Sequence, residues 1–155
     1  GGTPDSEVHP DERTRQTLFA RLNHYFPETR TAIHALVRAY LDDWGVLALT
    51  PEIRGYQMIG DSVIVRLSYR YYDQTAADFD QPTYTDEQIR TADQKLDRFR
   101  SPLLGAQLRV GLSFLGGTAL DFLDRTWLEI SFNYWFQTST FGDGILAQAG
   151  VRIPF

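Results

Sequence analysis

Residues 127–137 read WLEISFNYWFQ, and large apolar side chains recur at every second position. On an extended chain, one side carries Leu128, Ile130, Phe132, Tyr134 and Phe136, and the other carries Glu129, Ser131, Asn133, Trp135 and Gln137. A period of two is the period of a β-strand, because successive side chains point to opposite faces of a sheet. This stretch therefore predicts a strand with one apolar and one mainly polar face.

The same period recurs along most of the chain and predicts seven strands. Their expected ranges are 14–26, 31–42, 46–58, 62–73, 95–115, 125–138 and 144–155. Helix is the competing interpretation for 13–22 and 31–41, since both stretches contain good helix formers. Residues 1–13 contain two prolines and no apolar period, so we interpret them as a loop or tail before a single β-domain over 14–155.

The length and spacing of these strands indicate a membrane. Strands of about ten residues fit a tilted crossing of a bilayer, whereas strands of soluble sheets are nearer five or six residues. Short turns at 27–29 and 59–61 alternate with longer polar connections at 42–45, 74–93 and 139–144, although the connection at 116–124 departs from this pattern. Outer-membrane barrels have such a layout. No apolar run reaches roughly 18 residues, the length of a transmembrane helix. The predicted fold class is therefore all-β, an antiparallel transmembrane β-barrel.

The last strand ends in QAGVRIPF. It resembles the C-terminal β-signal of outer-membrane proteins at Gln148, Gly150, Ile153 and Phe155. Such a signal presents an unpaired strand edge with which an insertion machine can pair, and an aromatic anchor for the interface. The resemblance implies a bacterial outer-membrane location, with membrane lipid and the barrel insertion machinery as partners.

Five further segments, at 18–22, 25–27, 42–45, 70–72 and 76–79, resemble a bacterial family catalogued as domain of unknown function 3570. The resemblance implies an outer-membrane barrel longer than this chain, and it supplies no catalytic residues to carry over. The seven strands would then be the C-terminal part of a larger barrel. Bacterial single-chain barrels have an even number of strands, and lipid does not tolerate an open sheet edge. We therefore expect missing N-terminal strands or another chain to close the barrel.

The polar faces of the strands are rich in arginine, although the net charge of the chain is −5. If the apolar face meets lipid, the residues expected to face the lumen are Arg21, Arg38, Arg54, Arg66, Arg70, Arg109, Glu129 and Arg152. An arginine-lined lumen would make the barrel a channel that prefers anions. In the alternative interpretation, these arginines pair with carboxylates. The barrel is then plugged, and it is a structural or docking barrel that scaffolds a partner in the outer membrane.

Other function classes find little support in the sequence. There is no cysteine, the three histidines have no ligand spacing, and no catalytic triad or phosphate-binding loop is visible. The negative net charge argues against nucleic-acid binding. We therefore expect no enzyme activity, no cofactor, no metal and no nucleic-acid partner.

Overall fold

The computed structural model describes residues 13–77, 98–138 and 142–153, and within them every regular element other than two short 3₁₀ helices is a strand. The strands are β1 (Arg15–Phe26), β2 (Thr31–Asp42), β3 (Leu47–Ile59), β4 (Val63–Arg70), β5 (Asp73–Gln74), β6 (Phe99–Arg100), β7 (Leu103–Gly111), β8 (Trp127–Trp135) and β9 (Gly144–Arg152). The helix alternatives for 13–22 and 31–41 are thus wrong, because the apolar period of two places both segments in the sheet.

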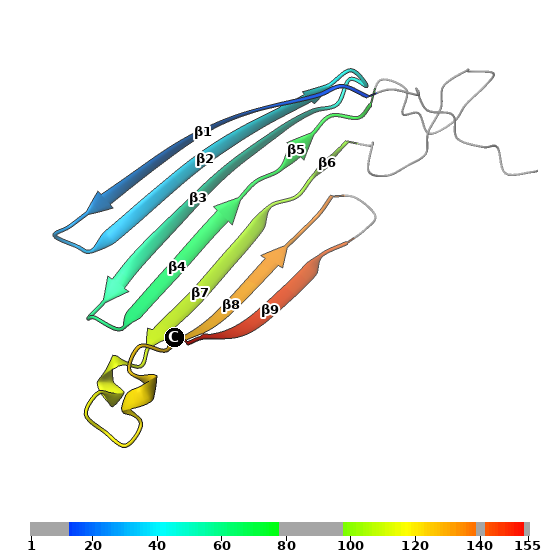
Figure 1. The fold of residues 1–155 in the computed structure, drawn as a ribbon. Coiled ribbons are helices and arrows are strands. Elements are labelled where there is room, and N and C mark those ends of the chain that lie inside the picture. The colour runs from blue at the N-terminus through cyan, green and yellow to red at the C-terminus, as the bar shows by residue number, and fades with distance from the viewer. Residues whose placement is uncertain (1–12, 78–97, 139–141, 154–155) are drawn as a thin grey trace, which may run out of the picture.

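All nine strands belong to one antiparallel sheet, whose order across the sheet is β1-β2-β3-β4-β7-β8-β9 (Figure 1). Each strand on this path pairs with the strand before it in the chain, apart from the step from β4 to β7. The short strands β5 and β6 pair with each other, and β5 also pairs with β3. The path therefore has the predicted seven positions.

β5 and β6 continue β4 and β7 in the same register. Arg70 lies opposite Leu103, and Asp73 lies opposite Arg100, so the pairing resumes without a shift after two residues. Tyr71 stands at the interruption, where the amide N–H of Tyr71 donates to the carbonyl of Pro51 at 3.0 Å. The register places Pro102 on the other side of Tyr71. Neither proline has an N–H, which explains why the ladder is interrupted there.

Three predicted strands are shorter than expected. The strand predicted over 95–115 ends at Gly111, where residues 113–115 form the 3₁₀ helix η1 (Ser113–Leu115), and η2 (Asp121–Leu123) follows. The strands predicted over 125–138 and 144–155 span 127–135 and 144–152. The alternation continues to Phe114, but β8 begins only at Trp127, so residues beyond Leu112 have no strand to pair with. Residues 95–97 of the first prediction and residues 154–155 of the last lie outside the described part of the chain.

A buried aspartate holds the turn between β2 and β3. The Asp42 side chain is fully buried. Its carboxylate accepts hydrogen bonds from Nε of Arg13 at 2.8 Å, from the Tyr40 hydroxyl at 2.8 Å and from the Val46 amide at 2.9 Å. The Arg13 guanidinium also lies 4.3 Å from the centre of the Trp44 ring. This charge-assisted network fixes the end of the sheet that carries the longer connections.

The sheet is curved and open. β1 pairs only with β2, and β9 pairs only with β8, so each of the two outermost strands has one unpaired edge among the described residues. The sheet also has almost no core of its own. Among the described residues, the buried hydrophobic side chains are Val46, Ala48 and Ala77. The described sheet therefore has little of the internal apolar burial that stabilises most folded domains.

Candidate functional site

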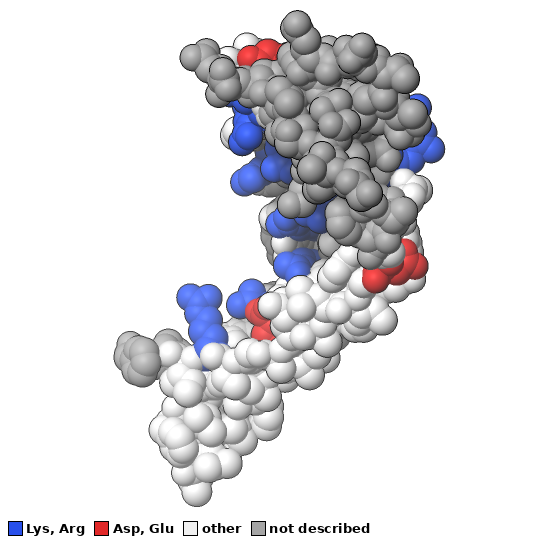
Figure 2. Space-filling model, turned by 90° about the vertical axis from the view of Figure 1, so that its right-hand side faces the viewer, with Lys and Arg blue, Asp and Glu red and all other residues white. Residues whose placement is uncertain are grey.

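The register of the sheet places all eight residues predicted to face a lumen on one face. Asn23 pairs with His34, His34 with Arg54, Arg54 with Ser68, Ser68 with Gly105, and Gly105 with Asn133. Directly paired residues share a face, and so do residues two apart on a strand. Steps of two residues along these strands reach Arg21, Arg38, Arg54, Arg66, Arg70, Arg109 and Glu129. Arg152 shares their face because it lies opposite Trp127, two residues before Glu129 on β8. Figure 2 shows basic side chains gathered along the hollowed side of the sheet. We call this side the concave face.

Three of the arginines line one hollow in the concave face. Its volume is about 220 Å³, and it is bounded by Glu52, Arg54, Arg66, Ser68, Arg70, Leu103 and Asn133. Glu52 lies opposite Arg70, and Arg54 lies opposite Ser68. The carboxylate in this set, Glu52, pairs with Nε of Arg54. We call this hollow, defined by these seven residues, the arginine hollow.

A smaller hollow lies on the other side of the Glu52–Arg54 pair. Its volume is about 140 Å³, and its lining includes Arg21, Asn23 and His34 besides that pair. The ion pair thus separates two basic hollows on neighbouring strands. Arg38 bounds neither of them.

The remaining predicted residues lie nearer the other end of the sheet. Nε of Arg109 is 3.2 Å from a carboxylate oxygen of Glu129, its neighbour across the strands, and that carboxylate also accepts a hydrogen bond from the Gln107 amide. Arg152 lies opposite Trp127 on β9. In the part of the chain that the structure describes, no ion pair is formed by Arg21, Arg38, Arg66, Arg70 or Arg152.

Gly105 lies beneath two residues of the arginine hollow, Ser68 and Asn133, and leaves room for their side chains. A Cβ at this position would overlap the Ser68 hydroxyl oxygen and would lie 2.7 Å from Oδ1 of Asn133. The Ser68 hydroxyl donates a long hydrogen bond, 3.4 Å, to the Gly105 carbonyl. Sequence reasoning did not single out Gly105. Its only signal was a glycine within a strand, which marks a close approach of some kind but not the partner.

Two tryptophans cover glycines at the two ends of β8. Trp127 lies opposite Gly111, and Trp135 lies opposite Gly144. A Cβ on Gly111 would lie 3.2 Å from the Trp127 ring, and a Cβ on Gly144 would overlap the Trp135 ring. An aromatic side chain beside a strand glycine restores packing that the glycine lacks. Both rings therefore belong to the concave face.

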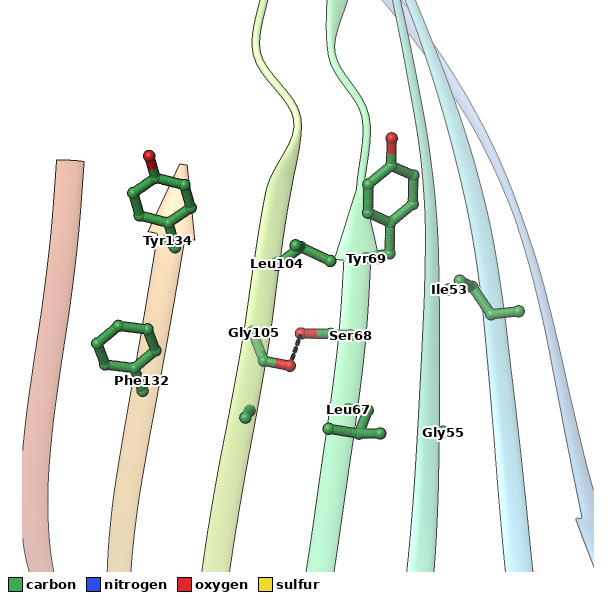
Figure 3. A pocket seen from close by; sticks show the side chains of 10 residues that line it. Ile53, Gly55, Leu67, Ser68, Tyr69, Leu104, Gly105, Phe132 and Tyr134 are labelled. Atoms are coloured by element: carbon green, nitrogen blue, oxygen red, sulfur yellow. Dashed lines mark hydrogen bonds between the residues drawn. The ribbon is translucent and has the colours of Figure 1, made fainter. Parts of the chain in front are cut away.

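The opposite, convex face is apolar and exposed on every strand of the path. Examples between 37% and 70% exposed are Leu22, Ile33, Ile53, Leu67, Leu108, Ile130 and Val151. A shallow depression of about 610 Å³ lies in this face, and Leu67, Tyr69, Leu104 and Phe132 contribute walls to it (Figure 3). Gly55 lies at its floor, with nothing within 4 Å of the position that a Cβ would occupy. Soluble monomers rarely expose a continuous apolar surface of this extent.

The residues that resemble an insertion signal lie on and after the last strand. Gln148 and Gly150 belong to β9, opposite Ser131 and Glu129. Ile153 follows the end of β9 and is 50% exposed. Phe155 lies outside the described residues. The outer edge of β9 has no pairing partner among the described strands.

The described residues also limit other kinds of site. Among them, no group of three or more histidine, aspartate or glutamate side chains is placed to hold a metal ion. No helix within the described ranges has the length and apolar character to cross a membrane.

The fold and its faces define the class, an all-β protein with one open antiparallel sheet, apolar on one face and arginine-rich on the other. A family model described as protein of unknown function (DUF3570) matches residues 5–149. The chain belongs to this family, as the resemblance of its sequence segments predicted. No curated protein and no solved structure matches the chain.

Proposed function

We propose that this chain forms part of a bacterial outer-membrane β-barrel whose convex face meets lipid and whose concave face lines the interior. The observation that carries the proposal is the exposed apolar surface on every strand of the path, in a sheet with almost no core of its own. Each Å² of apolar surface removed from water stabilises a protein by roughly 25 cal/mol. Contact with lipid would remove this apolar surface from water and so stabilise the protein. Six of the seven strands on the path have nine to thirteen residues, and β4 has eight. These lengths are close to that of a tilted bilayer crossing.

The odd number of positions on the path limits how the sheet could close into a barrel. β1 and β9 occupy the first and last of seven positions in an antiparallel path, so they run in the same direction. Pairing them directly would create a parallel junction, whereas outer-membrane barrels are antiparallel throughout. An odd number of further strands must therefore lie between β9 and β1. Strands from an N-terminal segment or from another chain would meet this condition equally well.

β9 is the edge at which we propose that the insertion machinery pairs. The outer edge of β9 is free among the described strands, and Gln148, Gly150, Ile153 and Phe155 carry the signal-like pattern. Phe155→Ala should lower the yield of folded barrel in the outer membrane. Quantification of the heat-modifiable form in membrane fractions measures this yield. An unchanged yield would contradict the proposal that the signal-like residues direct insertion.

The membrane proposal has a direct test on the full-length protein. After expression in a bacterial host, the protein should fractionate with the outer membrane and resist extraction by urea or carbonate. On unboiled gels it should migrate as a compact folded form that boiling converts to the extended one. A protein recovered in the soluble fraction in folded form would contradict the proposal.

Within the barrel, we propose an interior that favours anions, because arginine dominates the charges of the concave face. Reconstitution of the full-length protein in planar bilayers tests this. A salt gradient should give a reversal potential on the anion-selective side. A cation-selective pore would overturn the preference.

The second candidate is a plugged barrel that serves as a structural or docking protein. The Glu52–Arg54 and Glu129–Arg109 pairs favour it, because they show that carboxylates already neutralise some of these arginines. A bilayer that stays silent at all voltages, together with a stoichiometric protein partner in native detergent extracts, would favour this candidate over the channel.

A further inference from the structure

We infer that the arginine hollow is a binding site for a small oxyanion of the phosphate class. The hollow lies on the face that we propose lines the interior, so access of solutes to it rests on that proposal. Three guanidinium groups bound it, those of Arg54, Arg66 and Arg70. The carboxylate beside them, Glu52, is engaged by Arg54. Two positive charges thus converge on the hollow without a counter-charge among the described residues.

The backbone places Arg66 and Arg70 on the same face of one strand, at the edge of the same hollow. Arg66 and Arg70 lie on the same face of β4, on either side of Ser68. Four residues of strand span about 13 Å, and each arginine side chain can cover close to half of that distance. Both side chains bound the hollow. An oxyanion above Ser68 can therefore be approached from two sides along one strand.

One hydrogen-bond donor in this set is unused. Nε of Arg66 is buried and has no hydrogen-bond partner among the described residues. A buried donor without an acceptor is destabilising. An anion in the hollow would supply the acceptor, and it would restore the charge balance around Arg66.

The shape and chemistry of the hollow select the ligand class. A guanidinium presents a planar fork of N–H donors that matches two oxygens of a phosphate or carboxylate. Ser68 and Asn133 add neutral polar groups to the lining of the hollow, and both side chains lie over Gly105, which has no Cβ to displace them. A volume of about 220 Å³ admits a small ion with some of its water. A tetrahedral phosphate can present a separate pair of oxygens to each of two guanidinium forks, whereas acetate has a single pair of oxygens to share between them.

The experiment measures binding of inorganic phosphate to the full-length protein folded in detergent, by isothermal titration calorimetry at neutral pH. The double variant Arg66→Gln/Arg70→Gln should bind phosphate at least roughly tenfold more weakly, since hydrogen bonds to charged groups contribute this much or more. Arg66→Lys keeps the charge and removes the planar fork of N–H donors. Its affinity for phosphate should therefore lie between those of the wild type and the double variant. Arg125→Gln removes the same charge from the connection between η2 and β8, and it should bind phosphate as the wild type does. Acetate, tested in parallel, should bind more weakly than phosphate.

Heat-modified migration on gels verifies that each variant is folded, and the lysine variant keeps the test available if the double variant fails to fold. No phosphate binding by the folded wild type would overturn the inference, as would equal losses in the Arg125→Gln and Arg66→Gln/Arg70→Gln proteins. If the protein inserts into membranes and conducts ions but does not bind phosphate, the binding site is refuted and the proposed function is not. If phosphate binding depends on Arg66 and Arg70 but the protein never enters membranes, the proposed function is refuted and the binding site is not.

Discussion

The two faces of the sheet are formed by the same strands and differ at every alternate residue. On β4 and β7, the convex residues Leu67 and Leu108 are 62% and 42% exposed and have no apolar layer over them. The concave residues between them include Arg66, Ser68 and Gln107, which are partly buried and hydrogen-bonded or charged. The difference shows that each face is built for its own surroundings. The concave face makes specific contacts within the chain, whereas the convex face leaves its apolar side chains exposed.

The strongest test of this comparison places an arginine on each face of β7. If the convex face meets lipid as proposed, Leu108→Arg should destabilise the folded protein by about 2–4 kcal/mol, the cost of an arginine near the middle of a lipid-facing surface. Gln107→Arg is the matched control, because it adds the same side chain one residue away on the concave face. The new arginine there can still donate to Glu129, the present partner of Gln107. Urea unfolding of the full-length protein in lipid vesicles measures both values. Equal destabilisation by the two variants would mean that the faces do not differ in environment.

The second test concerns close packing at the edge of the concave face. Gly144→Ala should destabilise the protein by about 1–3 kcal/mol, the usual cost of overpacking a filled site. The added methyl would overlap the Trp135 ring, which must rotate away from β9. The same unfolding assay measures the loss, and Trp fluorescence reports movement of the ring. A variant as stable as the wild type, with an unchanged spectrum, would show that the ring does not cover Gly144.

The faces were predictable from the sequence because they depend on a local property. The period of two assigns each side chain to a face without reference to any other strand. Arg66, Arg109 and Arg152 all lie on the predicted polar face. The strand end at Gly111 was not predictable in this way. The alternation continues to Phe114, and only the late start of β8 at Trp127 ends the pairing.

The arginine hollow needed information that no single strand contains. Arg54 and Arg70 lie on different strands. They line the same hollow only because Glu52 lies opposite Arg70 in the register of β3 and β4. A shift of one residue would have moved every side chain of one strand to the other face. The place of Gly105 beneath Ser68 and Asn133 depends on two further registers. Sequence reasoning therefore identified the charges of the site but not their grouping.

The third test changes the balance of charge on the concave face. Glu129→Gln should cost about 1 kcal/mol or less, because the pair that it forms with Arg109 is partly exposed and screened by solvent. The substitution should have a larger effect on ion selectivity than on stability. The reversal potential in a salt gradient should move further toward anion selectivity, since Arg109 loses its counter-charge. Glu28→Gln, in the turn between β1 and β2, removes the same charge outside the concave face and should leave the potential unchanged. A shift toward cations in the Glu129→Gln protein would contradict an interior lined by this face.

The smallest effect is expected at Gly55, the convex counterpart of Gly144. Nothing lies within 4 Å of the position that a Cβ would take at Gly55, so alanine should fit without strain. Because alanine restricts the unfolded chain more than glycine does, Gly55→Ala should stabilise the protein by about 0.4–1 kcal/mol. The added methyl would also fill part of the depression beside Leu67 and Phe132, and in lipid it would gain apolar contact. Unfolding in vesicles, compared with Gly144→Ala, measures the sign of the change. A loss of stability at Gly55 would mean that another chain or an ordered ligand already packs against this depression, and the convex face would then be an interface rather than a plain lipid-facing surface.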